Sequence, residues 1–195
     1  MNEPEAVISA ASHVQGLSER FGNGETFAGF LKRDHDNSEL WNAIYKRAEV
    51  PPDLAARATA IDRRWNLLVL SEAWCGDSVN LLPFVARLQE VTPNIEMRLI
   101  GRDPNPDIMN DHLTRGSRSI PVVMVLDDEF TERGWWGPRP AELQRWVLEE
   151  GLPLPRPERY RHIRTWYARD QGRAVISEIL AIIEHPEAGN APAAL

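Results

Sequence analysis

The spacing of apolar residues changes along the chain and separates helical from extended segments. Between Thr26 and Val50 the apolar residues recur every three to four positions, which predicts helix with a break at Asp34–Ser38. Pro51 and Pro52 end that pattern, and we expect one more short helix within residues 53–64. The uninterrupted apolar run at residues 67–70 is typical of a strand buried on both faces.

Beyond that strand the period alternates between helix and strand. The expected segments are a helix at 76–91, a strand at 95–100, a short helix at 105–114, a hairpin with arms at 121–126 and 130–135, and a helix at 140–149. A proline-rich linker at 152–157 precedes a single long amphipathic helix over 158–184.

This order of elements predicts an α/β sandwich with a mixed sheet. We expect one domain over residues 1–195, with its core at 62–151 and a helical N-terminal extension at 1–61. Residues 152–195 are expected to form the C-terminal helix and a frayed tail from His185.

Charge and composition narrow the class of function. The net charge of −7 argues against a nucleic-acid partner, because phosphate binding needs a basic surface. No apolar run is long enough to span a membrane, and residues 1–11 do not resemble a secretory signal, so we expect a cytoplasmic protein. One cysteine excludes an internal disulfide, and the five histidines lack metal-ligand spacing, so no metal site is expected.

The single cysteine, Cys75, lies where the strand at 67–70 gives way to a helix. At a helix N-terminus, unpaired N–H groups and the helix dipole favour the thiolate, which is the reactive form. The carboxylates of Glu72 and Asp77 would raise the thiol pKa if they faced the sulfur, whereas a hydrogen bond from Ser78 would lower it. The sequence leaves the balance between these effects open.

The run Trp74-Cys75-Gly76-Asp77-Ser78 resembles the thioredoxin active-site motif, Trp-Cys-Gly-Pro-Cys. Two further prolines fit that resemblance. Pro83 matches the proline that kinks the active-site helix, and Arg118–Pro121 resembles the segment ending in the family's cis-proline. The likeness covers roughly residues 62–151. It implies a thioredoxin-like three-layer α/β/α sandwich with a mixed central sheet, plus N-terminal helices and a long C-terminal helix.

The resemblance also implies roles for individual residues. Cys75 would be the nucleophile, and the catalytic segment would be completed by Gly76, Asp77 and Ser78. The substrate groove would be shaped by Trp74, Ile120, Pro121 and Trp136. The backbone at Ile120 would pair with an extended peptide. Trp136 falls near a glycine that lines the groove in the family, so its indole would narrow or reshape that groove. The run Trp136–Pro140 and the final helix are similar to a poorly characterised bacterial branch of thioredoxin-like proteins.

Three departures from the motif limit the function that can be inferred. Ser78 replaces the second cysteine, Asp77 replaces the intervening proline, and Val69 stands where the family has a buried aspartate. Without a second thiol, a substrate captured by Cys75 must be released by an external thiol such as glutathione, acting as a co-substrate, or by a partner protein. No other cofactor is expected.

Two hypotheses therefore remain. In the first, the protein is a monothiol disulfide-exchange protein acting on protein thiols and disulfides or on a low-molecular-weight thiol. In the second, it is a redox-inactive binding module that keeps the fold. A buried sulfur would favour the binding module. The sequence leaves the oligomeric state open.

Overall fold

The computed structural model describes residues 16–186 of the chain. Residues 16–23 are helical. The remaining helices are α2 (Phe27–Lys32), α3 (Ser38–Arg47), α4 (Pro52–Thr59), α5 (Gly76–Val91), α6 (Pro106–Asp111), α7 (Ala141–Trp146), a π-helical turn (Val147–Gly151), α8 (Arg156–Asp170) and α9 (Arg173–Glu184). The strands in this part of the chain are β1 (Trp65–Ser71), β2 (Ile95–Gly101), β3 (Val122–Leu126) and β4 (Glu132–Trp136).

The four strands form one mixed sheet in the order β2-β1-β3-β4. β1 pairs in parallel with β2 and antiparallel with β3, and β3 continues antiparallel into β4. Every residue of β1 is buried, because the strand is central and has helices on both of its faces. The apolar run at 67–70 predicted this placement.

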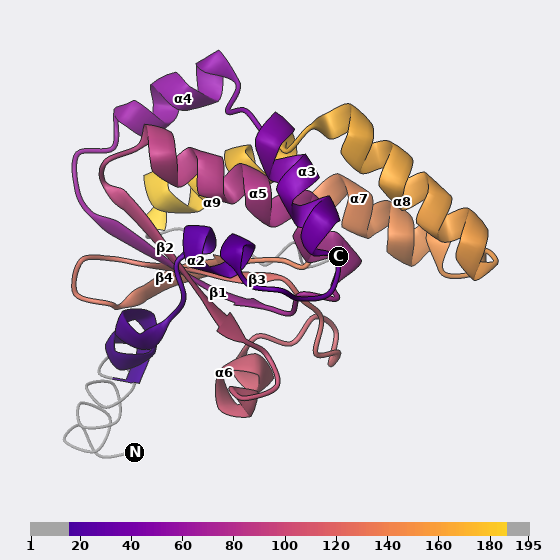
Figure 1. Ribbon diagram of the computed structural model, residues 1–195, viewed down its shortest axis with the longest axis horizontal. Helices are drawn as coiled ribbons and strands as arrows, with labels where there is room; N and C mark the ends of the chain where they lie inside the picture. The colour runs from indigo at the N-terminus through magenta and orange to yellow at the C-terminus, as the bar shows by residue number, and fades with distance from the viewer. Residues whose placement is uncertain (1–15, 187–195) are drawn as a thin grey trace.

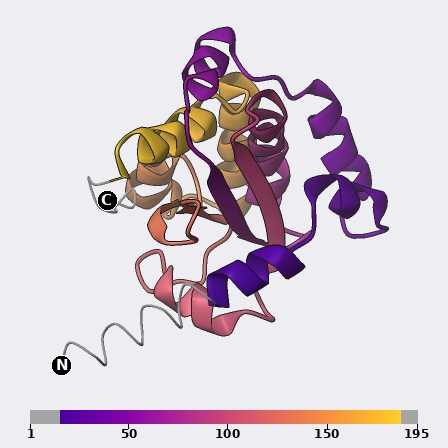
Figure 2. The ribbon, with the colours of Figure 1, turned by 90° about the vertical axis from the view of Figure 1, so that its left-hand side faces the viewer.

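Helices cover both faces of the sheet, as the two ribbon views show (Figures 1 and 2). In Figure 1, α3, α4, α5 and α9 lie above the sheet, and α6 lies below it. Alternate residues of β1 enter two separate cores: Leu67 and Val69 join the first, and Leu68 and Leu70 join the second. The predicted three-layer α/β/α sandwich is confirmed.

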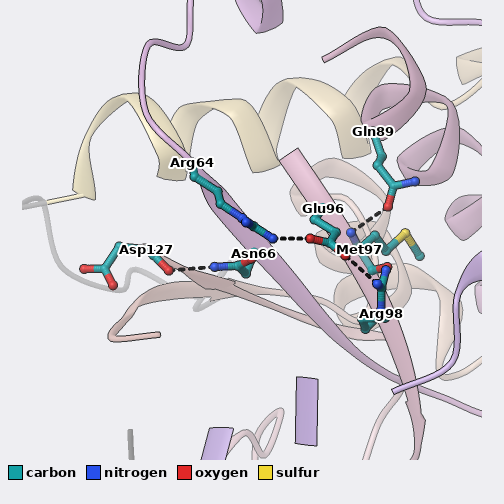
Figure 3. Close-up of polar contacts among 7 residues, drawn as sticks. All are labelled: Arg64, Asn66, Gln89, Glu96, Met97, Arg98 and Asp127. Atoms are coloured by element: carbon teal, nitrogen blue, oxygen red, sulfur yellow. Dashed lines mark hydrogen bonds and ion pairs between the residues drawn. The ribbon is translucent and has the colours of Figure 1, made fainter. Parts of the chain in front are cut away.

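Polar contacts occupy the outer edge of the sheet at β2, part of which pairs with Glu25, and Figure 3 shows several of them. Gln89 of α5 accepts the backbone N–H of Met97 at 2.6 Å through its side-chain oxygen. Glu96 pairs with Arg64 and with Arg98, which places charge on the edge strand. Exposed strand edges invite pairing with other chains, and charged or occupied edges resist it.

The C-terminal helical segment differs from the prediction. The single helix expected over 158–184 is wrong, because the chain turns at Gln171 (φ 52°) and Gly172 (φ 76°) between α8 and α9. A Cβ atom at Gly172 would lie only 2.1 Å from Cγ of Phe84, so α9 can begin this close to α5 only with glycine there. The tail beyond residue 186 lies outside the described residues.

The turn at Gly172 lets α9 join the central core. Its apolar face, which includes Val175 and Ile179, packs in the same core as Val69 of β1 and Val85 of α5. The helices after residue 151 are therefore part of the packing around the sheet. No helix within residues 16–186 has the length and apolar character needed to cross a membrane.

Candidate functional site

Cys75 occupies the N-cap of α5, after the short turn that follows the end of β1 at Ser71. The turn before α5 positions Cys75, because the Cys75 N–H donates a hydrogen bond to the Glu72 carbonyl at 3.0 Å. The sulfur accepts the backbone N–H of Ser78 at 3.5 Å, and the thiol donates to the Ile120 carbonyl at 3.4 Å. The residue is only 7% exposed. The sulfur thus lies at the helix N-terminus that the sequence predicts, and neighbouring residues cover it.

The opposing effects on the thiol pKa add up to an increase. Burial is the largest and raises the pKa of Cys75, and the charge of Asp77 adds to it. The side chain of Ser78 lowers the pKa, as do the backbone N–H groups of Ser78 and Asp77. The Ser78 hydroxyl is buried without a hydrogen bond of good geometry, yet it lies near enough to favour the thiolate. The net effect favours the protonated thiol over the thiolate.

Asp77 is held by two side chains from distant parts of the chain. Arg139, in the loop between β4 and α7, pairs with its carboxylate at 2.5 Å, and the Tyr167 hydroxyl of α8 donates to it at 2.7 Å. Arg139 also donates to the side-chain oxygen of Gln144 at 3.0 Å. The Asp77 side chain is 13% exposed. These contacts fasten the N-terminus of α5 to two other elements.

The same contacts shift two pKa values. Burial raises the pKa of the Tyr167 hydroxyl well above its usual value, and the Asp77 charge adds to the effect. Burial opposes the charge on Arg139, but Asp77 and the neighbouring groups outweigh it and raise the pKa of that guanidinium. Arg139 and Tyr167 are site residues that sequence reasoning missed. Tyr167 is 90 positions from Asp77, and no motif connects them.

The groove side of the site contains the cis peptide between Ile120 and Pro121. Gly137 packs directly against it, because a Cβ atom there would lie 2.2 Å from the Pro121 carbonyl oxygen. Trp136, which the resemblance placed near the groove, lies in the core between the sheet and α9 and donates through its indole to Glu178 at 2.5 Å. Cys75 and Ile120 belong to the core on the other face. The residue beside Pro121 is therefore Gly137.

Trp74 forms the exposed rim of the site. Its side chain is 50% exposed, and the Arg102 guanidinium lies 5.0 Å from the centre of its ring. Arg102 also donates to the Arg118 carbonyl at 3.3 Å, so the indole lies beside a loop with two arginines. Glu72 accepts the backbone N–H of Asp103 at 3.2 Å, and it is not among the groups that shift the Cys75 pKa.

Metal-binding groups do not gather at this site. Within residues 16–186 no three side chains of the His, Cys, Asp and Glu types lie close enough to hold one ion. His13, one of the five histidines, lies outside this range.

Comparisons with known proteins agree with this geometry. A family model described as thioredoxin matches residues 24–160. A protein of unknown function from Pseudomonas aeruginosa, PA1234, is 31% identical, with a TM-score of 0.69, over 86% of this chain and 96% of that one. An HIV epitope-scaffold is 30% identical with the same TM-score and coverage. No curated protein matches the chain. The extent of the family match and the identity to these structures show that the chain belongs to the thioredoxin family.

Proposed function

We propose that this protein carries out thiol–disulfide exchange with Cys75 as its single reactive thiol. The observation that carries the proposal is the N-cap geometry, in which the Cys75 sulfur accepts the Ser78 N–H at 3.5 Å. A thiolate formed there would be stabilised by that N–H and by the dipole of α5. Membership of the thioredoxin family supports the same chemistry.

The reaction follows from the presence of one thiol. The Cys75 thiolate attacks one sulfur of a substrate disulfide, forms a mixed disulfide and releases the other sulfur as a thiolate. Because Ser78 cannot attack that bond, the thiolate of glutathione or of a partner protein attacks the substrate sulfur. Cys75 leaves as a thiolate, and the incoming thiol is now bonded to the substrate. The proposal assigns the protein to the cytoplasm, where free thiols persist.

The covered sulfur sets a condition on this chemistry. The Cys75 thiol donates to the Ile120 carbonyl, so a substrate must displace that contact to reach the sulfur. A peptide that pairs with the backbone at Ile120 would do so, and the half-exposed Trp74 would contact its side chains. In the absence of substrate, the raised pKa predicts slow reaction at neutral pH.

The test is the rate at which the folded protein reacts with 5,5′-dithiobis(2-nitrobenzoate) as a function of pH. We expect the folded protein to react with this reagent. At neutral pH its rate should be lower than that of the unfolded chain, and the rate should increase at higher pH than it does for an ordinary thiol. Cys75→Ser must be silent, because the chain has no other cysteine. A folded protein that reacts only after unfolding would contradict the proposal.

A redox-inactive binding module is the second candidate, and the burial of Cys75 favours it. In this case the thiol is part of the core, and partner binding does not depend on the sulfur. A partner identified with the wild-type protein would then bind Cys75→Ser with the same affinity. Loss of that binding in the variant would count against the module.

A further inference from the structure

A groove separate from the Cys75 rim lies where α3, α5 and α8 meet. Figure 1 shows the three helices on the same side of the sheet. The cavity has a volume of about 680 Å³, within the roughly 300–1,000 Å³ of small-ligand sites. Its apolar wall comes from Ile44 of α3 and Phe84 of α5 together with Val50.

The rim of this groove carries unpaired positive charge. Arg47 of α3 and Arg164 and Arg169 of α8 line it, and none of them forms an ion pair with another residue in the range 16–186. Arg173 also lines it but is already paired with Asp53 at 2.5 Å.

Two acidic residues lie among these arginines. The Asp170 carboxylate accepts the Ala174 N–H at 3.1 and 3.2 Å, and Glu49 forms no ion pair within the described residues. The three guanidinium groups without an ion pair outnumber these two carboxylates, although that of Arg47 donates to the Ala43 carbonyl at 3.2 Å. In a chain whose net charge is −7, the groove is therefore a local region of positive charge.

We infer that this groove binds a small amphipathic anion, with an apolar body against Phe84 and Ile44 and an acidic group among the arginines. Guanidinium groups suit carboxylate, sulfonate and phosphate groups because they donate several hydrogen bonds in one plane. The volume of the groove and its mixed apolar and basic lining favour a small molecule of this chemistry.

The groove also has a structural connection to the thiol site. Tyr167 lines it, and the hydroxyl of the same residue donates to Asp77, two residues after Cys75. Binding in the groove needs no thiol chemistry, however. Cys75→Ser should therefore bind the anion as the wild-type protein does, which separates this inference from the proposed function.

The test uses the fluorescent aryl sulfonate 1-anilinonaphthalene-8-sulfonate as the amphipathic anion and N-phenyl-1-naphthylamine as its uncharged counterpart. We expect saturable binding of the sulfonate to one site on the folded protein, weakened about tenfold by Arg164→Gln, since a hydrogen bond to a charged group is worth roughly that factor. Ala168→Glu, which adds a negative charge to an exposed position in the groove, should abolish sulfonate binding. Binding of the uncharged dye should survive Arg164→Gln.

The matched control is Arg145→Gln, because Arg145 is exposed on α7 and does not line the groove. It should leave sulfonate binding unchanged. Partly unfolded chains also bind this dye, so each variant must first show the cooperative unfolding of the wild type. The inference is overturned if the folded protein does not bind the sulfonate, or if Arg164→Gln and Ala168→Glu bind it as tightly as Arg145→Gln does.

Discussion

Gly137 gives the sharpest test of how the loop after β4 fits against the groove. Its φ angle is +143°, which L side chains rarely adopt, and an added Cβ would meet the Pro121 carbonyl oxygen at 2.2 Å. The same Cβ would also lie 3.2 Å from the Pro121 carbonyl carbon and 3.3 Å from the Val122 Cα. All of these are backbone atoms, so no side-chain rotation can relieve the overlap.

Gly137→Ala should therefore move the backbone and destabilise the protein. Overpacking costs about 1–3 kcal/mol, and a sparsely populated backbone conformation costs about 1–3 kcal/mol more. We expect the free energy of unfolding to fall by the sum of these two costs, about 2–6 kcal/mol. For a chain of this size that corresponds to a fall in Tm of very roughly 4–24 °C.

The assay is urea unfolding followed by circular dichroism, with Gly116→Ala as the matched control. Gly116 also has a positive φ, +77°, but a Cβ there would meet no atom within 4 Å. The control should lose only about 1–2 kcal/mol from strain. If the free energy of unfolding fell equally in the two variants, the close approach of Gly137 to Pro121 would not be what requires glycine.

Three further predictions concern hydrogen bonds within the fold. Tyr167→Phe removes the donor to Asp77 and should lower the free energy of urea unfolding by about 1.5–3 kcal/mol. The control Tyr160→Phe, at an exposed position, should change that free energy by less than about 0.5 kcal/mol. Equal losses in the two variants would refute the prediction. Burial opposes the charge on His112, but the contact with Glu132 outweighs burial and raises the pKa of His112. The pair therefore stabilises the fold fully below about pH 6.5, the pKa of an ordinary histidine. This stabilisation decreases as pH rises through the folded-state pKa. In unfolding measured against pH, His112→Gln should lose that dependence, and a wild-type dependence retained in the variant would contradict the assignment. Gln89→Leu removes the acceptor of the Met97 N–H and should cost about 1–3 kcal/mol; unchanged stability would mean that water satisfies that N–H.

Features of the fold that depend on local sequence were predictable. β1 was identifiable because a central strand buried on both faces needs an uninterrupted apolar run. The break between α8 and α9 was missed, because the helical period continues across it, although Gly172 is of the residue type that commonly ends helices. The close approach of Gly172 to Phe84 of α5 joins residues far apart in the sequence, so no local pattern could reveal it.

The site divides in the same way. The N-cap position of Cys75 involves only residues 75–78, so the motif itself indicated it. The pairing of Asp77 with Arg139 and Tyr167 joins three separate elements, and no spacing rule could reveal it. The position of Trp136 was inferred by counting along a motif. The structure shows that the adjacent residue, Gly137, meets Pro121.

These contacts change how the substituted motif should be understood. From sequence, Asp77 was a negative charge beside a thiol, opposing its ionisation. In the structure its carboxylate is neutralised in part by Arg139 and anchors the start of α5. Burial has the largest effect on the Cys75 pKa, and the charge of Asp77 has a smaller one. A peptide bound at Ile120 would free the sulfur from that carbonyl but would also cover it, so burial would continue to raise the pKa of Cys75 in the complex. What a substrate changes is therefore access to the sulfur.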